Sequence, residues 1–543
     1  MPYIAYDIRG IQQYIFSVPK LKFIVGGSVV LDRFDNEYVP QIAGNSGGQI
    51  RFSGGGKGII EFCKTEDGTR IKDGLLKTAK TLGVDLRLGV AGSLAEALEG
   101  AEELFPFVPD CLDGEPCGVS GLWPTGAEGK GWLANVHPVV RRKYEEYKTD
   151  EFGARILEEL SKRPEWPTAL EDVPCLFMKN VSPDRNDDEG EQAHARAAQR
   201  NLGSRNRWAV VAMDGNDIGR QQRALDKLPD REKDDALANM SRQLRECTRN
   251  AFLAGLAGAI AAWAKQSDGK IERLNTGEAV LPFRPLILGG DDILALCHVA
   301  HAFELARNIA RTFETESAKT PECWPATGGK LAMSAGVLFC GVGYPLHTAI
   351  PYAESLLASA KGRFRDTSGE KPSPAAIDWE SATENLLDSP AARRRRELCF
   401  VDQDLQPGGR PLEVSLTRRP YRLYGDGKPG NDAWNAETFD ELARLSELLE
   451  AIPPSARMEI RRRLRAPWAD RCAFVASLNK NLVVGGKSEP ERLSDLLQEY
   501  PAERRGKAWR DKDQPNGSKI RDTALCDAIA ILEESRRMSV ETA

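Results

Sequence analysis

Two adjacent carboxylates stand in the middle of an apolar stretch at residues 286–296, LILGGDDILAL. Asp291 and Asp292 directly follow Gly289 and Gly290, so GGDD occupies the turn of an apolar hairpin pattern. Carboxylates held this close repel each other unless a cation lies between them. The pair therefore predicts a divalent-cation site, whereas GGDD taken alone also fits an ordinary surface turn.

A third carboxylate ends the apolar strand pattern RWAVVAMD at residues 207–214. In the expected fold this strand lies beside the hairpin, which brings Asp214 close to Asp291. Oxygen ligands on a rigid sheet suit Mg²⁺ or Mn²⁺. We expect Asp214, Asp291 and Asp292 to be the catalytic residues. The expected metal ligands are these three carboxylates and the backbone carbonyl of Gly215.

The residues around the carboxylates fit a nucleotide. Gly289 and Gly290 permit turn geometry that other residues disfavour, and they let a base or ribose approach the backbone. Lys361 ends the helical pattern LLASAK and is expected to reach a triphosphate, with an exposed helix-end lysine as the alternative. Asp217 is expected to cap the following segment or to support the metal ligands.

The pattern of elements around this site occurs twice in the chain. Each copy reads strand, helix, hairpin, helix, strand, which is the ferredoxin-like, palm-type order. In the first copy Asp7 ends the first strand pattern, and SGGGKG at residues 53–58 falls on the GGDD hairpin. This copy has Gly56 and Lys57 where the second copy has its two aspartates. Only the second copy therefore keeps a full acidic site.

Composition restricts the class of protein. The chain has 543 residues, of which 41% are hydrophobic and 28% charged, as in ordinary soluble proteins. We find neither a membrane-spanning stretch nor a secretory signal, and we expect a cytoplasmic protein without a membrane partner. A net charge of −6 argues against nonspecific coating of nucleic acid. Arginine clusters at 393–396, 461–465 and 504–505 fit solvated helix faces or local contacts with phosphate or an acidic partner.

We expect an α+β protein with two ferredoxin-like palm domains in tandem. The expected divisions are 1–105 for the first palm, 106–206 for an inter-palm module, 207–380 for the second palm, 381–429 for a connecting segment and 430–543 for a C-terminal helical domain. The helical expectation rests on patterns such as ETFDELARLSELLEAI and TALCDAIAILEESRRM.

Several motifs together resemble one known family. MDGNDIG, LILGGDDILAL, MSAGVLFCG with a downstream SAK, AAIDW and LTRRPYRL resemble the large polymerase-like subunit of type III CRISPR effector complexes. SGGGKG looks like the first palm of that family, which lacks the acidic pair. The resemblance covers about residues 1–425 and implies GGDEF/cyclase-like palms.

The resemblance implies a function. Such subunits join ATP through 3′–5′ bonds into cyclic oligoadenylate second messengers of antiviral defence when target RNA activates them. Asp214, Asp291 and Asp292 would hold Mg²⁺ or Mn²⁺. The turn residues Gly54, Gly55 and Gly56 would face them and help to hold the acceptor nucleotide. The implied partners are guide RNA and target RNA in a multisubunit ribonucleoprotein, together with small helical and repeat-protein subunits.

The sequence also departs from the family. None of the five histidines is followed by aspartate, so we expect no HD-type nuclease. Many members carry a zinc module with two cysteine pairs. Here only Cys111 and Cys117 lie near each other, with His137 further on, which favours a zinc-free module.

Two other functions remain open. A catalytically silent scaffold would keep the fold and bind a nucleotide or RNA, although the intact aspartates argue against it. A diguanylate cyclase has GG(D/E)EF, whereas Ile293 follows Asp292 here. The sequence does not reveal base choice, so ATP rests on the resemblance.

Overall fold

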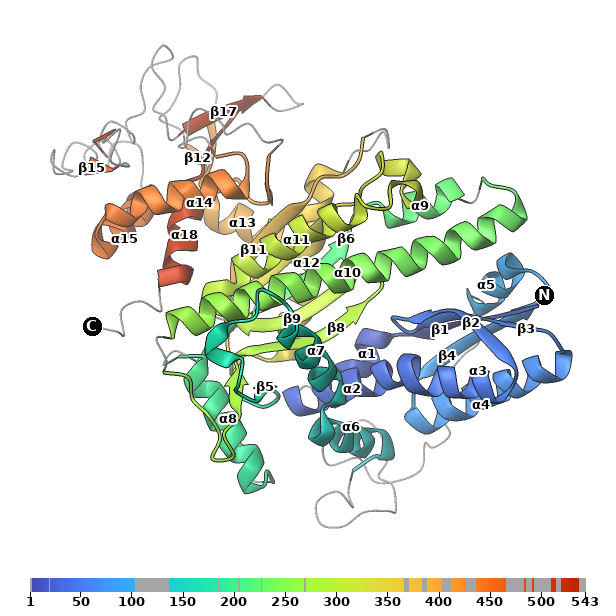
Figure 1. Ribbon diagram of the computed structural model, residues 1–543. Helices are drawn as coiled ribbons and strands as arrows, with labels where there is room; N and C mark the ends of the chain where they lie inside the picture. Colours follow the sequence, from blue (N-terminus) through green and yellow to red (C-terminus); the bar gives the residue numbers. More distant parts are fainter. Residues whose placement is uncertain are drawn as a thin grey trace. The chain divides into compact units, whose positions relative to one another are not determined.

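The computed structural model divides the chain into two compact units, which are described separately (Figure 1). It describes residues 2–18, 20–102, 136–182, 186–203, 206–225, 227–267, 270–365, 371–382, 388–402, 412–425, 436–464, 483–484, 491–492, 509–513 and 519–536. Unit 1 comprises Met1–Met333, Cys340–Pro351 and Ser368–Pro372, and unit 2 comprises Ser334–Phe339, Tyr352–Thr367 and Ser373–Ala543. Both predicted nucleotide-binding turns lie in unit 1.

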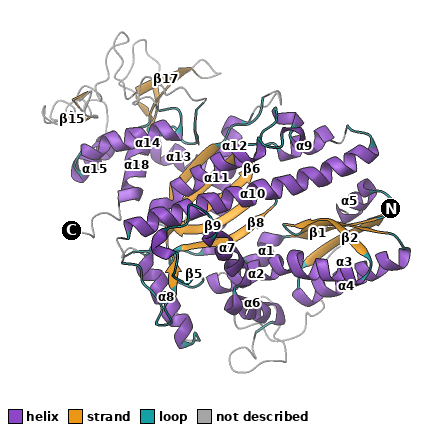
Figure 2. Ribbon diagram, viewed as in Figure 1, coloured by secondary structure: helices purple, strands orange, loops and turns teal. Residues whose placement is uncertain are grey.

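The first sheet of unit 1 has four strands in the order β2-β3-β1-β4 (Figures 1 and 2). These are β1 (Tyr3–Arg9), β2 (Gly48–Gly54), β3 (Lys57–Phe62) and β4 (Asp85–Ala91). Strand β1 is central and antiparallel to both β3 and β4. Its backbone is paired on both sides, and Ile4, Ala5, Tyr6 and Ile8 are buried on the two faces of the sheet, as expected of a central strand with the pattern YIAYDIR.

Helices cover both faces of this sheet. They are α1 (Ile11–Ile15), α2 (Leu21–Arg33), the π-helical turn η1 (Phe34–Tyr38), α3 (Val39–Asn45), α4 (Thr65–Leu82) and α5 (Leu94–Glu102). On one face Ala5 packs against Ala97 and Ala101 of α5. On the other face a Cβ on Gly48 would contact Ile71 of α4. Because successive side chains of a strand point to opposite faces, the sheet contributes to two apolar layers, one on each face.

A helical region of unit 1 follows the first palm. It contains α6 (Pro138–Thr149), α7 (Glu151–Ser161), η3 (Thr168–Leu170), β5 (Cys175–Phe177) and α8 (Glu189–Asn201). Helix α6 packs so closely on α2 that a Cβ on Gly26 would overlap the carbonyl group of Lys143. Asp150 caps α7 and accepts two hydrogen bonds from Arg284, at 2.6 and 2.8 Å. This buried ion pair ties the helical region to the second hairpin.

The second palm begins with an antiparallel arrangement in unit 1. It contains β6 (Arg207–Gly215), α9 (Ile218–Leu225), α10 (Asp230–Gln266), β7 (Ala279–Leu281), β8 (Phe283–Gly289), β9 (Asp292–His298), η4 (Val299–His301), α11 (Ala302–Ser317), η5 (Pro321–Cys323) and η6 (Pro325–Thr327). Strand β9 lies between β6 and β8. Helix α10 packs against α11 and also contacts β8 and β2.

The two hairpins share one register. Asp7 lies opposite Lys57 in the first palm, as Asp214 lies opposite Asp292 in the second. Each hairpin also shifts register at the equivalent place, between Ile50 and Phe52 in one and between Pro285 and Ile287 in the other. This agreement supports the internal duplication inferred from the sequence.

Unit 2 completes the strand pattern predicted for the second palm. It contains most of β10 (Met333–Gly341) and α12 (Leu346–Phe364), followed by β11 (Ala376–Ser381) and β14 (Tyr421–Arg422). Strand β10 is parallel to β11, and β11 is antiparallel to β14. A Cβ on Gly336 would lie 2.2 Å from the carbonyl oxygen of Ala353, so β10 and α12 pack backbone to backbone. The predicted α+β class is confirmed.

The last part of unit 2 differs from the helical expectation for residues 430–543. Helices α13 (Pro390–Leu398), α14 (Phe439–Leu448), η8 (Leu449–Ala451), α15 (Pro454–Arg463) and α18 (Leu525–Arg536) are present. A four-stranded sheet of order β12-β13-β18-β17 accompanies them, formed by Cys399–Asp402, Leu412–Ser415, Lys519–Thr523 and Trp509–Asp513. Two short strands, β15 (Val483–Val484) and β16 (Glu491–Arg492), also pair. Strand β18 pairs with β13, far earlier in the chain, so local sequence did not reveal it.

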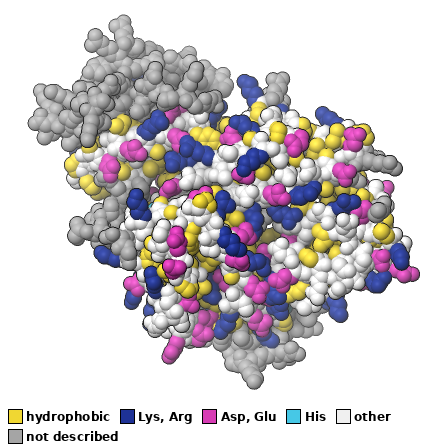
Figure 3. All heavy atoms as spheres, viewed as in Figure 1, with side chains coloured by type: hydrophobic (Ala, Val, Ile, Leu, Met, Phe, Trp, Pro, Cys, Tyr) yellow, Lys and Arg dark blue, Asp and Glu magenta, His cyan; other side chains and the backbone are white. Residues whose placement is uncertain are grey.

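The surface carries charges of both signs. Basic and acidic side chains are interspersed over the face seen in Figure 3. Within the described part of the chain, none of the helices has the length and apolarity required to traverse a bilayer.

Candidate active site

Three aspartates come from two neighbouring strands of unit 1. Asp214 lies near the end of β6 and pairs with Asp292, the first residue of β9. Directly opposed residues of an antiparallel pair project from the same face of the sheet. Asp291 occupies the turn immediately before β9. The structure therefore brings together the three carboxylates that the sequence singled out.

The electrostatics of this group centre on Asp291. Burial raises the pKa of Asp291 well above its usual range, and the carboxylate of Asp214, a hydrogen bond with Asp214 and the charge of Asp292 act in the same direction. Asp292 itself is exposed. The negative charges of this group therefore oppose one another, and a bound cation would relieve the repulsion.

The oxygen donors of this group fit a magnesium-type ion. The described residues contain no ready-made group of three or more His, Cys, Asp or Glu side chains in metal-binding geometry. Mg²⁺ commonly binds through one or two carboxylates and takes its other ligands from water and substrate phosphates. Asp214 and Asp291, which are in contact, together supply two carboxylates.

Gly215 is packed directly against the acidic turn. Its N–H donates to the carbonyl oxygen of Asp291 at 3.3 Å, and a Cβ on Gly215 would lie 3.0 Å from the Cβ of Asp291. A larger residue would therefore displace Asp291. The role of the Gly215 carbonyl as a metal ligand stays a prediction.

The glycine turns of the two palms touch. A Cβ on Gly289 would lie 2.8 Å from the Cα of Gly55, and a Cβ on Gly55 would lie 3.3 Å from the backbone nitrogen of Gly290. Gly55 and Gly290 also have positive φ angles of 65° and 58°. Gly55 therefore makes the contact with Gly289 and Gly290, and Gly54 and Gly56 flank it in the same turn. The nucleotide-binding role of these five glycines stays a prediction.

Other predicted residues have less defined places. Lys361 lies in α12, in the part that belongs to unit 2, and its role stays a prediction. Asp217 has a φ of 62° and precedes α9, where its carbonyl accepts from the N–H groups of Arg220 and Gln221. Cys111 and Cys117 lie outside the described residues. His137 caps α6 by accepting from the N–H of Val139 at 3.2 Å.

Two residues near the glycine turn were missed by the sequence analysis. Arg245 of α10 donates to the carbonyl oxygen of Ser53, which lies 192 residues earlier in the chain. Asp35 of η1 accepts from the N–H of Gly56 at 2.7 Å. Neither residue belongs to a recognisable motif, and contacts this distant in sequence depend on the tertiary fold.

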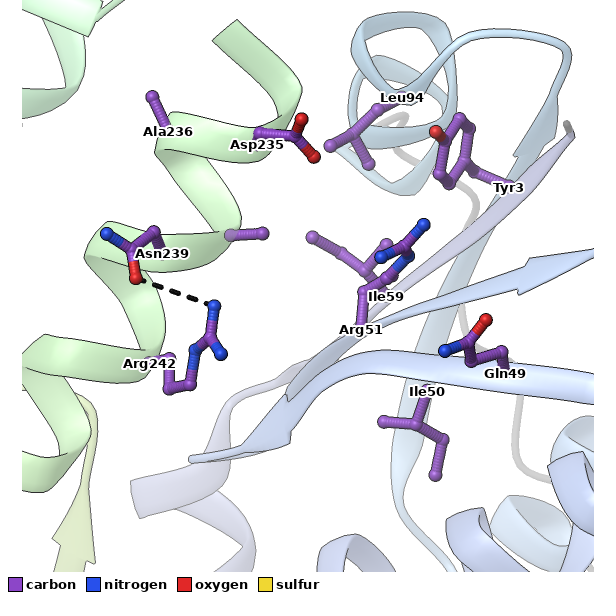
Figure 4. Close-up of a pocket in the computed structure, with 11 residues that line it drawn as sticks. Tyr3, Gln49, Ile50, Arg51, Ile59, Leu94, Asp235, Ala236, Asn239 and Arg242 are labelled. Carbon is purple, nitrogen blue, oxygen red and sulfur yellow. Dashed lines mark hydrogen bonds between the residues drawn. The ribbon is translucent and has the colours of Figure 1, made fainter. Parts of the chain in front are cut away.

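A separate cavity of about 630 Å³ lies between the first sheet and α10 (Figure 4). Its lining residues are Tyr3, Gln49, Ile50, Arg51, Ile59, Leu94, Asp235, Ala236, Ala238, Asn239 and Arg242. Arg242 donates to the side-chain oxygen of Asn239 at 3.4 Å. Two guanidinium groups and one carboxylate line this cavity, so it differs in charge from the acidic turn.

Comparison with known families identifies the second palm. Residues 207–368 match the family model of the Cas10/Cmr2 second palm domain. The chain contains a Cas10 second palm. The predicted resemblance is thereby confirmed, and the matched Cas10 region includes Asp214, Asp291, Asp292 and the glycines of the GGDD turn.

Solved structures similar to this Cas10-like chain include the Csm1-Csm4 cassette in complex with cA3, at 17% identity and a TM-score of 0.35, covering 67% of this chain and 53% of that one. Csm1 of T. onnurineus has 16% identity and a TM-score of 0.36, with coverages of 67% and 52%. The cassette in complex with cA4 has 15% identity and a TM-score of 0.34, with coverages of 71% and 55%. The chain thus spans about half the length of these structures. No protein of curated function matches it.

Proposed function

We propose that this Cas10-like chain is a metal-dependent nucleotidyltransferase that joins ATP into cyclic oligoadenylates. One observation carries the proposal: Asp214 and Asp291 are in contact at a turn whose glycines touch the glycine turn of the first palm. An acidic pair beside a half-buried backbone turn suits a cation and a nucleotide together.

The reaction requires one bond to form and one to break. The 3′-oxygen of one ATP attacks the α-phosphorus of another, a new P–O bond forms, the α–β phosphoanhydride bond breaks and pyrophosphate leaves. The proton of the 3′-hydroxyl passes to solvent. When bound, Mg²⁺ or Mn²⁺ supplies charge neutralisation at the phosphates and favours loss of this proton.

The residues of the chain hold and orient the reactants. Asp214 and Asp291, with the exposed Asp292, would anchor the cation and fix the position of the phosphates. Gly290 would let the donor nucleotide lie against the backbone of the acidic turn, because a Cβ there would meet nothing within 4 Å, whereas Gly55 fills the corresponding space at Gly289. The facing glycine turn would hold the acceptor, and this proximity would supply much of the rate enhancement.

The identity of the substrate and of the partners rests on the family resemblance. We propose ATP as the substrate and Lys361 as a triphosphate contact. We also propose that the chain works in a type III CRISPR-like complex of antiviral defence, with guide RNA, target RNA, small helical subunits and repeat-protein subunits. Target RNA would activate synthesis in that complex.

The test is to incubate the purified protein with Mg²⁺ or Mn²⁺ and each labelled nucleoside triphosphate, with and without guide and target RNA. We expect cyclic oligonucleotides from ATP, and none from the Asp291→Ala/Asp292→Ala variant. Product from that variant would overturn the site. Product from GTP alone would favour a diguanylate cyclase. A complete complex that makes no product would favour a silent scaffold.

A further inference from the structure

The glycine turn of the first palm is held at one end by a residue of the second palm. Arg245, in the middle of α10, donates to the carbonyl oxygen of Ser53, the residue before the three glycines. Its guanidinium carbon lies 4.6 Å from the centre of the Phe52 ring. A Cβ on Gly54 would lie 2.5 Å from the Nη1 atom of Arg245, so the guanidinium group occupies the space that a side chain would take.

The other end of the turn is held from within the first palm. The N–H of Gly56 donates to Oδ2 of Asp35 at 2.7 Å, and the hydroxyl of Tyr6 donates to Oδ1 at 3.0 Å. The hydroxyl oxygens of Tyr6 and Ser53 lie 2.7 Å apart, and Ser53 also donates to the backbone carbonyl of Asp35 at 2.9 Å. Tyr6, Asp35 and Ser53 are all buried. The network therefore holds the side chain of Ser53 at the start of the turn and the backbone N–H of Gly56 at its end.

The π-helical turn η1 supplies Asp35. Single π turns inside helical segments are uncommon and often occur at functional sites. Here η1 lies between α2 and α3, and it delivers a buried carboxylate to the N–H of Gly56. Because glycine loses more conformational freedom on ordering than any other residue, three consecutive glycines need such external constraints to keep one conformation.

Gly55 lies between these two anchor points and touches the GGDD turn. The backbone nitrogen of Gly290 is 3.3 Å from where a Cβ of Gly55 would lie. Any movement of Ser53 or Gly56 therefore changes the spacing between the turns. Helix α10 belongs to the second palm, so the contact of Arg245 with Ser53 joins the two palms two residues before Gly55, which touches the GGDD turn.

We propose that Arg245 is a positioning residue, which together with the buried Asp35–Tyr6–Ser53 network holds the glycine turn of the first palm against the GGDD turn. This inference rests on the proposed function for its effect on catalysis. Its structural part, the fixing of the turn by Arg245, stands independently of what the site binds.

The test compares Arg245→Met with Arg245→Lys and with the control Arg242→Met. Arg242 is one helical turn earlier in α10, is exposed, and makes the 3.4 Å hydrogen bond to Asn239 seen in Figure 4. In Arg245→Met we expect kcat for oligoadenylate synthesis to fall by about 10- to 100-fold, because a displacement of about 1 Å has effects of this size. Mn²⁺ affinity should stay within about twofold, since the aspartates are unchanged. Arg245→Lys should restore part of kcat, and Arg242→Met should keep it.

A second readout separates failure of this inference from failure of the proposed function. Hydrogen exchange of the amides of residues 54–58 should become faster in Arg245→Met and stay unchanged in Arg242→Met, even if the wild type makes no oligonucleotide. Unchanged exchange and unchanged kcat in Arg245→Met would overturn the positioning role. A loss of kcat accompanied by an equal loss in Arg242→Met would also overturn it.

Discussion

Gly55 and Gly289 meet backbone to backbone, so closely that a Cβ on Gly289 would lie 2.8 Å from the Cα of Gly55. Gly55 lies in the turn of the first hairpin and Gly289 ends the strand that leads into the turn of the second, and the two hairpins have the same register and the same bulge. One turn carries the acidic pair and the other carries glycines. The contact therefore links the acidic site of the second palm to its non-acidic counterpart in the first.

Replacing Gly289 with alanine should separate the turns. Gly289→Ala should lower the free energy of unfolding by about 1–3 kcal/mol, the usual cost of overpacking, and should lower the proposed oligoadenylate synthesis by about 10- to 100-fold. Gly44→Ala is the matched control, because a Cβ there would meet nothing within 4 Å and alanine favours the helix. Urea unfolding and synthesis rates measure both effects, and wild-type synthesis by Gly289→Ala would contradict the importance of the contact.

The first palm should not accept an acidic residue where the second palm has Asp291. Gly56 has a φ of 77°, donates to Asp35, and has Ile11 Cδ1 2.5 Å from where its Cβ would lie. Gly56→Asp should therefore lower the free energy of unfolding by about 2–4 kcal/mol, through backbone strain, crowding and a second carboxylate near Asp35.

Lys57→Asp is the comparison for that variant, since Lys57 is exposed. It should change the free energy of unfolding by less than about 1 kcal/mol. Equal effects of the two substitutions would show that the turn conformation does not restrict residue 56.

Arg394 should be structural although it belongs to a cluster of four arginines. It donates to Asp378 at 2.5 and 2.8 Å, and both side chains are buried in unit 2. Arg394→Leu would leave the carboxylate of Asp378 buried without its partner, and should lower the free energy of unfolding by about 3–5 kcal/mol. Arg395 is exposed, and Arg395→Leu should change the free energy of unfolding by less than about 0.5 kcal/mol. Similar losses in thermal or urea unfolding for both variants would refute this distinction.

The stability of unit 1 should depend on pH through Lys143. Burial lowers the pKa of Lys143 from 10.5 to about 7, while its Nζ donates to the Tyr14 carbonyl and to Ser17 Oγ. Between these two values the unfolded chain binds more protons than the folded chain, so the free energy of unfolding rises with pH. Relative to Lys143→Met, the wild type should gain up to about 1.4 kcal/mol per pH unit between pH 7 and 9. Urea unfolding at several pH values checks this, and parallel pH profiles for the two proteins would rule it out.

The sequence predicted those parts of the site that local patterns encode. Apolar strands that end in Asp7 and Asp214, and glycine-rich turns inside apolar hairpins, were enough to align the two palms. The structure pairs Asp214 with Asp292 as the strand order requires. The α+β class and the Cas10 second palm are also confirmed. Both were predicted from side-chain alternation and turn residues, which are local signals.

What the sequence did not reveal depends on distant contacts. Arg245 is one of many charged residues in α10, and only the packing of α10 against β2 places it on the carbonyl of Ser53. Asp35 gains its role from η1 and from burial beside Tyr6. Strand β18 is charged and short, and its partner β13 lies far away in the chain.

The central claim is that Asp214 and Asp291 together hold a divalent cation, and Mn²⁺ binding followed by electron paramagnetic resonance tests it most directly. The measurement compares the wild type with Asp214→Asn, Asp291→Asn and Asp7→Asn, where Asp7 is the first-palm equivalent of Asp214. We predict that Mn²⁺ affinity falls at least about tenfold in Asp214→Asn and Asp291→Asn, because each loses a charged oxygen ligand, and that Asp7→Asn keeps the wild-type affinity. Wild-type Mn²⁺ affinity in folded Asp214→Asn and Asp291→Asn proteins would contradict the account.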